Sequence, residues 1–522
     1  MSKTILDNNS QFYKNPFFVL GLIIISGIVL RLLFFSIKIP VVLDSFDYYM
    51  FAMDIKFTHE IPNYSPSKAG WPFFLSGLFS IIPFNETYTF MEIQKLTSVV
   101  FSSITAIPIF YLSKLFFPKK YGILAAIIFV FDPRVVSNSS LGSTDPMFVF
   151  LIATSLALFL RKNIFLSYIA FFTAGMASSV RPEGLFLFFT LTILYFIKHR
   201  KNHSELFKYG FCLLIFLVTI YPFMNYQQNI HGNDLLFNRL ENTVAYHIQD
   251  PKMTENNSGI PFLIKGLENF PKYLGWILIP NFIIFAPVGF ILSFKKLDFN
   301  KFSLFLTGII LSTPIFYSYA IPLQDTRYLL PLYPLLSIWT IFLVKKFDKF
   351  SKIHLVIPLC VIIILSTIFI LIKYDSEYEL EVLEITKELN KSPKILNDFY
   401  PNSNLLESSD LPNNVEEFKR DFLIQREEGK SIRTSLEHKI KIIPNIDYES
   451  IEQLMTYAKQ NNLTHLVIEK DSQNSIFNMI YQNESDYSFL EKINNENNLK
   501  KYKVKIFEIN YNRYESSYNI RN

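Results

Sequence analysis

Hydrophobic and polar positions divide this chain into long apolar runs separated by short polar segments. A helix of about 20 apolar residues crosses the hydrocarbon core of a bilayer, and eleven runs approach or reach that length. The pattern therefore predicts a polytopic α-helical membrane protein with about eleven transmembrane helices. The predicted helices are 17–37, 93–116, 121–136, 145–160, 164–180, 184–198, 206–224, 272–294, 302–320, 327–345 and 353–373.

One further apolar segment, Gly70 to Pro83, does not fit this scheme. As a helix of about 14 residues it would be roughly 21 Å long, which is short of a hydrocarbon core of about 30 Å. We predict a re-entrant or interfacial helix with Trp71 as an anchor at the membrane interface. Residues 38–92 then form a long first external loop.

Lysine and arginine residues gather in every second loop between the predicted helices. Cytoplasmic loops of membrane proteins carry an excess of these residues, so all of the clusters are assigned to the cytoplasm. This topology puts the N-terminus in the cytoplasm and the region after the last helix outside. The clusters are Lys114 with Lys119 and Lys120, Arg161 with Lys162, Lys198 with Arg200 and Lys201, Lys295 with Lys296 and Lys301, and Lys345 with Lys346 and Lys349.

The pattern changes at Tyr374, where mixed helix and strand signals begin. Charged amphipathic helices are predicted at Glu377–Asn390 and Glu449–Gln460. Buried and half-exposed strands are predicted at Leu463–Glu469 and Lys501–Asn510. We therefore expect a transmembrane domain at residues 1–373 and an external soluble α/β domain at residues 374–522.

Composition supports a membrane protein and argues against other classes. The 522 residues are 50% hydrophobic and include 54 phenylalanines and 29 tyrosines, which is unusual for a soluble domain. Cys212 and Cys360 both lie in apolar runs, so neither a disulfide framework nor a cysteine metal site is expected. The net charge is +5 and the basic residues gather in short loops, so nucleic acid is not an expected partner.

The most informative polar positions are two acids that follow the first apolar run. Asp44 and Asp47 lie three residues apart, so on a helix their side chains share a face. Carboxylates near hydrocarbon are costly and often functional, and either acid could be the general base that deprotonates a hydroxyl attacking a sugar. The alternative is that both acids stabilise the start of an interfacial helix.

Three arginines lie at the external ends of apolar runs, away from the cytoplasmic clusters. They are Arg134, Arg181 and Arg327. Guanidinium groups bind phosphate well, so these side chains could hold the phosphate of a lipid carrier, although single arginines also reach to the membrane interface. Arg327 is the strongest candidate because it opens the motif Arg-Tyr-Leu-Leu-Pro. The neighbouring Glu183 could simply pair with Arg181.

A further acid, Asp145, follows Gly-Ser-Thr and precedes Pro146. This context is typical of a helix start with proline at the first helical position. Alternatively, Asp145 could position an acceptor or hold a divalent cation such as Mg²⁺ or Mn²⁺ together with Asp44 or Asp47.

The motifs, taken in chain order, resemble those of the GT-C superfamily of membrane glycosyltransferases. The resemblance rests on the acidic pair after the first predicted helix, the long first external loop, Thr144-Asp145 at the start of a later helix and the Arg-Tyr-Leu-Leu-Pro motif. Within the superfamily, the chain is most similar to the dolichyl-phosphate-mannose protein mannosyltransferase and aminoarabinose transferase group, in particular to its archaeal branch. The resemblance covers about residues 15–345 and does not extend to the C-terminal domain.

The resemblance implies a polyprenyl-phosphate (dolichyl) sugar donor, an external active site and an inverting direct displacement. Asp44 matches the first-loop acid that is the family's proposed base. Asp47 stands three residues on, where some members have an adjacent acid, so which acid acts stays open. Arg327 matches the family's Arg-Tyr position near the donor phosphate, and Arg181 and Asp145 match less closely. No cofactor is required in this group, whereas related oligosaccharyltransferases need a metal and carry a Trp-Trp-Asp signature that this chain lacks.

The sequence therefore predicts a multi-pass membrane enzyme, in the cell membrane or, in a eukaryote, the ER membrane. By this resemblance it would transfer a sugar, a hexose such as mannose, from a polyprenyl-phosphate-linked donor to a hydroxyl on a protein, lipid or glycan at the external face. Two alternatives are a transporter or flippase for a lipid-linked sugar, and a non-catalytic membrane subunit that displays the C-terminal domain. A transporter would hold ionisable groups near the middle of the membrane and often shows internal repeats.

Overall fold

The structure is a computed structural model that falls into two compact units, each described by itself. The helical unit comprises Met1–Phe35, Asp47–Ile82 and Ile93–Tyr374, and the second unit comprises Ser36–Phe46, Pro83–Glu92 and Asp375–Asn522. The residues that the structure describes are 15–62, 64, 68–201, 203–231, 259–321, 325–351, 356–373, 383, 394–397, 411–427, 441–443, 450–469, 474–493 and 504–518.

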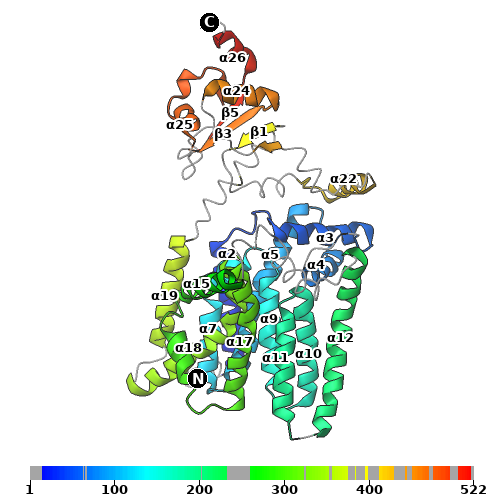
Figure 1. Cartoon of the computed structure of the whole chain (residues 1–522), viewed down its shortest axis with the longest axis vertical. Coiled ribbons are helices and arrows are strands. Elements are labelled where there is room, and N and C mark those ends of the chain that lie inside the picture. The colour runs from blue at the N-terminus through cyan, green and yellow to red at the C-terminus, as the bar shows by residue number, and fades with distance from the viewer. Residues whose placement is uncertain are drawn as a thin grey trace, which may run out of the picture. The chain divides into compact units, whose positions relative to one another are not determined.

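Each of the eleven predicted transmembrane segments overlaps one helix or two consecutive helices (Figure 1). In chain order they are α2 (Pro16–Phe34), α5 (Thr87–Ile104) with α6 (Ala106–Ser113), α7 (Lys119–Val130) with α8 (Pro133–Ser139), α9 (Asp145–Phe159), α10 (Ile164–Val180), α11 (Gly184–His199), α12 (His203–His231), α15 (Gly259–Leu278) with α16 (Phe285–Ser293), α17 (Phe299–Ala320), the 3₁₀ helix η1 (Thr326–Leu332) with α18 (Tyr333–Ser351), and α19 (Val356–Lys373).

The number of spans stays a prediction. Among the described residues, five helical stretches are long and apolar enough to cross a membrane, or six if the bent α7–α8 pair is one span. The helices α9, α10 and α11 are apolar but have only 15 to 17 residues. At 1.5 Å per residue these helices are about 22 to 26 Å long, which is shorter than a hydrocarbon core of about 30 Å.

The predicted short helix in the first external loop is α4 (Gly70–Ile81), which has 12 residues. The prediction that Trp71 anchors this helix at the membrane interface is wrong. Its side chain is fully buried within the protein, and its indole N–H donates a hydrogen bond to the carbonyl oxygen of Gly142 at 3.1 Å. A buried indole N–H needs such a partner. The sequence around Trp71 does not indicate that its partner is a carbonyl 71 residues away.

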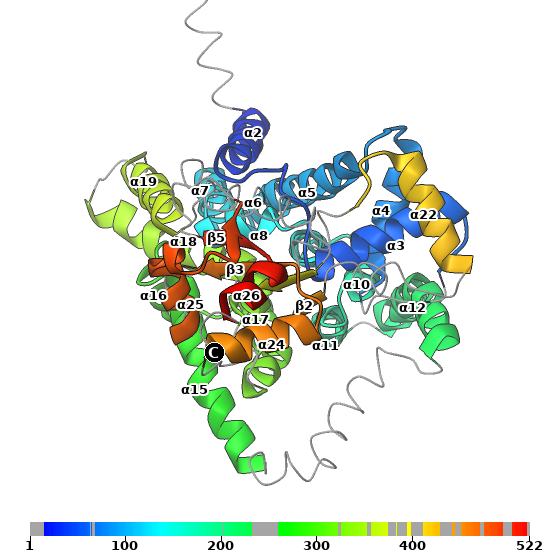
Figure 2. The ribbon, with the colours of Figure 1, turned by 90° about the horizontal axis from the view of Figure 1, so that it is seen from above.

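Small residues allow the long helices to pack closely. Helix α10 contacts α9, α11 and α12, and Figure 2 shows α11 and α12 near α10 from above. Its buried positions include Ala170, Ala174 and Ala177, and small side chains of this kind are typical of helix interfaces in membranes. The contact between α16 and α18 is another close one: a Cβ atom added at Gly289 would overlap the carbonyl oxygen of Trp339.

We therefore expect Gly289→Ala to destabilise the packing of α16 on α18. Overpacking of this kind costs about 1–3 kcal/mol of unfolding free energy, and here the obstacle is backbone, which cannot rotate away. The matched control is Gly275→Ala in α15, because a Cβ there would meet nothing within 4 Å. Thermal unfolding of the purified variants should show a lower midpoint for Gly289→Ala only, and equal midpoints would contradict the close contact.

The C-terminal part of the second unit is built around a mixed five-stranded sheet with the order β2-β1-β3-β5-β4. Strand β1 pairs in parallel with β2 and β3, and β5 pairs antiparallel with β3 and β4. Its apolar core includes Leu466, Phe477 and Phe507. The elements are β1 (Lys394–Asn397), β2 (Lys441–Ile443), α24 (Ile451–Gln460), β3 (His465–Glu469), α25 (Ser475–Gln482), β4 (Leu490–Lys492), β5 (Val504–Ile509) and α26 (Tyr511–Tyr518).

Three of the elements predicted after Tyr374 are present in the structure. They are the helix at 449–460, the strand at 463–469 and the strand at 501–510, which correspond to α24, β3 and β5. The predicted helix at 377–390 lies, apart from residue 383, outside the described residues. A separate soluble domain that begins at residue 374 stays a prediction, because the second unit also takes in two short segments of the first external loop.

Candidate functional site

The first external loop carries the two predicted catalytic acids on one helix, α3 (Asp44–Thr58). Asp44 is the first residue of this helix and is exposed, and Asp47 lies one turn further on and is half-buried. Both acids therefore lie on one helix, which is the condition under which their side chains share a face. Their catalytic role stays a prediction.

Sequence reasoning missed a third acid on the same helix. Asp54 is 2% exposed, and it accepts a hydrogen bond from the Thr58 hydroxyl at 3.3 Å and another from Tyr64. Tyr64 also lies within electrostatic range of Asp47. The signal was present in the sequence, because Asp47 and Asp54 are seven residues apart and positions with that spacing lie on one face of a helix.

A buried ionic cluster joins the start of α9 to the turn between α10 and α11. The Arg181 guanidinium contacts the Asp145 carboxylate through Nη1 and the Glu183 carboxylate through Nη2 (2.8 Å) and Nε (3.3 Å). The side chains of Arg181 and Asp145 are only 6% and 4% exposed. The predicted pairing of Glu183 with Arg181 is confirmed. With one cation between two carboxylates, the cluster has a formal charge of −1.

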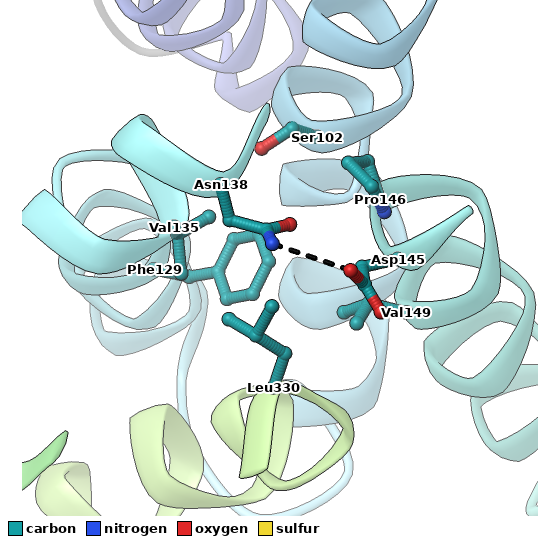
Figure 3. A pocket seen from close by; sticks show the side chains of 8 residues that line it. All are labelled: Ser102, Phe129, Val135, Asn138, Asp145, Pro146, Val149 and Leu330. Carbon is teal, nitrogen blue, oxygen red and sulfur yellow. Dashed lines mark hydrogen bonds between the residues drawn. The ribbon is translucent and has the colours of Figure 1, made fainter. Parts of the chain in front are cut away.

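The second oxygen of Asp145 is also engaged, as Figure 3 shows for Asn138. Oδ2 accepts hydrogen bonds from Asn138 Nδ2 at 3.2 Å and from the Ser143 hydroxyl at 3.1 Å. Asn138 and Asp145 adjoin a cavity of about 10 Å³ that is lined by Ser102, Phe129, Val135, Asn138, Asp145, Pro146, Val149 and Leu330. A cavity of this size has room for about one water molecule.

The surroundings of Asp145 offer little to a metal ion. Both of its oxygens already accept hydrogen bonds from neighbouring side chains. In the described part of the chain, no three His, Cys, Asp or Glu side chains gather where they could hold a cation. The sequence-based idea of a divalent cation on Asp145 therefore gains no support from the geometry.

Two residues from the first external loop and α5 hold the turn that leads into Asp145. The carbonyl oxygen of Gly142 accepts hydrogen bonds from the Trp71 indole at 3.1 Å and from Gln94 Nε2 at 2.9 Å. Gly142 has a φ of +69°, which glycine adopts without steric cost. The position of Asp145 is thus fixed by contacts with two other helices as well as by its own turn.

The three predicted arginines have different environments. Arg327 pairs with Asp325 (Nε to Oδ2, 2.5 Å), and its side chain is 40% exposed. Arg134 donates a hydrogen bond to the Trp276 carbonyl at 2.8 Å and lies over the ring of Phe369. Arg181 is the buried one. Of these three, and counting partners among the described residues, the Arg327 guanidinium alone combines substantial exposure with a single acidic partner.

The structure brings two of these arginine regions together. A second small cavity of about 10 Å³ is lined by Arg181, Glu183 and Tyr328, along with apolar residues of α9 and α17. Tyr328 directly follows Arg327 in η1. The ionic cluster and the Arg-Tyr motif therefore adjoin each other, whereas the contacts of Arg134 are with α15 and α19.

A buried arginine in α2 was also missed by sequence reasoning. Arg31 is 1% exposed and donates hydrogen bonds of 2.9 Å to the Ser139 hydroxyl, the Ser102 hydroxyl and the Gly27 carbonyl. Ser102 lines the same cavity as Asp145. An isolated charge in an apolar run was the available signal. Its partners lie far away in the sequence, so the pattern alone could not identify them.

Part of this region matches a known family of proteins. Residues 71–226 match the sequence model of the dolichyl-phosphate-mannose-protein mannosyltransferase family. The matched stretch contains Arg134, Asp145 and Arg181, and it excludes Asp44, Asp47 and Arg327. No curated protein sequence matches the chain.

Two solved structures have a similar fold. The oligosaccharyltransferase of Archaeoglobus fulgidus, solved with Zn and sulfate, is 12% identical, with a TM-score of 0.51 over 89% of this chain and 69% of that chain. ArnT from Cupriavidus metallidurans, solved with undecaprenyl phosphate, is 10% identical, with a TM-score of 0.52 over 94% and 97%. Identities this low indicate a shared fold alone.

Taken together, the family match and the shared fold confirm the resemblance to GT-C membrane glycosyltransferases. They also support an integral membrane protein. The membrane in which it resides and the sides on which its termini lie stay predictions.

Proposed function

We propose that this protein is a glycosyltransferase that moves a sugar from a polyprenyl-phosphate donor to a hydroxyl acceptor at the external face of the membrane. The observation that carries the proposal is the family match over residues 71–226, a stretch that contains Asp145 and Arg181. The name of that family supports a hexose such as mannose. The undecaprenyl phosphate in the structure of ArnT supports a polyprenyl-phosphate carrier.

In the proposed reaction, an acceptor hydroxyl attacks the anomeric carbon of the sugar. The bond from that carbon to the phosphate oxygen breaks, and the polyprenyl phosphate leaves with the electron pair. Asp44 takes the hydroxyl proton, and Asp47 positions Asp44 or the acceptor. Direct displacement inverts the configuration of the sugar. Exposure of Asp44 at the start of α3 supports its access to an acceptor.

Arg327 is the proposed partner of the departing phosphate. Its exposed guanidinium can present a fork of N–H donors to phosphate oxygens, and charge stabilisation of this kind is often a large contribution to the rate. Arg181 would first have to release two carboxylates, so we assign it to holding the adjoining turn. Because Arg327 supplies the positive charge, the proposed reaction needs no metal ion.

The test is sugar transfer by the full-length protein in reconstituted membranes. Radiolabelled polyprenyl-phosphate hexose is supplied with candidate protein, lipid and glycan acceptors, with and without a chelator. We expect transfer that depends on an acceptor and survives the chelator. Movement of the labelled lipid across the membrane without transfer would contradict the proposal and favour a flippase.

Arg327→Ala should lower the transfer rate by about 10²–10³-fold, which is typical for loss of a group that stabilises developing charge. Arg327→Lys keeps the charge but loses the fork, so its rate should lie between those of wild type and alanine. The control is Arg161→Ala, which changes an arginine in a predicted cytoplasmic loop. Equal rates for Arg327→Ala and wild type would remove Arg327 from the phosphate site.

A further inference from the structure

A segment of the C-terminal region pairs with the first external loop inside the second unit. Glu86 and Asn414 form an antiparallel β-bridge. The Thr87 amide donates to the Asn413 carbonyl at 2.8 Å, and the Val415 amide donates to the carbonyl of Asn85 at 2.9 Å. Hydrogen bonds therefore run in both directions between residues that are more than 300 positions apart in the chain.

Side chains reinforce this backbone pairing. The hydroxyl of Thr87 donates to the Pro412 carbonyl at 2.6 Å, and the hydroxyl of Tyr88 donates to the Leu411 carbonyl at 3.3 Å. Thr87 is completely buried and Leu411 is 5% exposed. Buried backbone groups need partners, so each side of the contact satisfies polar groups of the other.

The segment continues into an amphipathic helix, α22 (Val415–Glu427). Asn414 caps it by accepting a hydrogen bond from the amide of Glu416 at 2.9 Å. Its buried side chains, Val415, Phe418 and Phe422, recur at helical spacing and are 2–8% exposed. The opposite face is charged and exposed, so α22 buries one apolar face.

The same compact unit contains the loop segment that carries the proposed base. Residues 36–46, with Asp44, group with residues 83–92 and with the C-terminal region. Both ends of the first external loop thus belong to one body with residues 411–422. A catalytic group must be held closely to be effective, because a misplacement of about 1 Å can cost about 10²-fold in rate.

We infer that residues 411–422 are a positioning element that holds the first external loop and, through it, Asp44. This inference rests on the proposed function. It gives the C-terminal region a part in the reaction rather than the role of an appended module. Thr87 is the central residue of this contact, because its amide and its hydroxyl both donate hydrogen bonds to residues 411–422.

Thr87→Pro tests the inference because it removes the hydrogen bonds that the Thr87 amide and hydroxyl donate. Proline is also compatible with this position in α5. Thr87 is the first residue of α5, a position where proline is favoured, and the preceding Glu86 lies in a β-bridge, which fits the extended conformation preferred before proline. Thr87→Val removes only the hydroxyl, and Thr87→Ser retains it. Arg420→Ala on the exposed face of α22 is the control.

Hydrogen exchange of the full-length protein in nanodiscs is the first readout. In Thr87→Pro we expect faster exchange in residues 83–92 and 411–422 and, decisively, in 36–46. Thr87→Val should show a smaller increase in all of them, whereas Thr87→Ser and Arg420→Ala should match wild type. Unchanged exchange in residues 36–46 would overturn the inference, whether or not the protein proves to be a glycosyltransferase.

Transfer kinetics are the second readout. Thr87→Pro should lower kcat about tenfold or more, while the KM for the lipid donor stays within about twofold of wild type. Thr87→Ser should have the kcat of wild type. A loosened loop with normal kcat would overturn the positioning role. If wild type transfers no sugar, the proposed function fails, and exchange in residues 36–46 alone decides whether this segment holds the loop.

Discussion

Asp44→Asn should abolish sugar transfer without reducing the amount of folded protein. Asparagine has nearly the same shape as aspartate but cannot take up a proton, and loss of a general base typically costs about 10²–10⁴-fold in rate. Asp44 is exposed at the start of α3, so we expect its replacement to leave the packed core unchanged. The measurement is the initial transfer rate in reconstituted membranes, with equal amounts of monodisperse protein.

Asp47→Asn is the matched comparison, because Asp47 lies one turn later on the same helix. If Asp44 is the base, Asp47→Asn should retain measurable transfer, with its main effect on the KM for the acceptor. The reverse outcome would assign the base to Asp47. Normal turnover by Asp44→Asn would remove Asp44 from the chemistry altogether.

The helices of the bundle were predictable because long apolar runs have few alternatives in a membrane. Their breaks were harder to predict. The α7–α8 pair bends by 56° next to Asp132, whose side chain accepts hydrogen bonds from the amides of Arg134 and Val135. An Asp-Pro pair within an apolar run indicates a helix start. The apolar run at 121–136 was nevertheless predicted to be one continuous span.

The sequence identified residues of the candidate site mainly as charged side chains at the ends of helices, and it did not identify their partners. Arg181 and Asp145 were found because charges at the ends of apolar runs are conspicuous, and Glu183 because it is two positions from Arg181. Whether Arg181 is free for a phosphate depends on Asp145, 36 residues away. The partners of Arg31, Ser102 and Ser139, are 71 and 108 residues away. Such pairings are set by helix packing, which hydropathy does not encode.

Arg181→Met should be the most destabilising of the substitutions considered for this cluster. It leaves Asp145 and Glu183 facing each other without their shared cation, so the formal charge of the cluster changes from −1 to −2. Removing one partner of a buried ion pair costs about 3–5 kcal/mol of unfolding free energy. Asp145→Asn should cost less, because Arg181 keeps its bidentate contact with Glu183 and the pair becomes neutral. Thermal unfolding of the purified protein measures the difference.

The double variant Arg181→Met with Asp145→Asn, compared with Arg181→Met, distinguishes two roles of Arg181: neutralising the buried carboxylates and binding a ligand. If Arg181 serves mainly to neutralise the two carboxylates, the double variant should be more stable than Arg181→Met, because one of the repelling charges is gone. If Arg181→Met instead unfolds at the wild-type temperature but transfers no sugar, the guanidinium must exchange its carboxylates for a ligand during the reaction. The buried cluster would then be the resting state of a phosphate-binding arginine, as the sequence predicts.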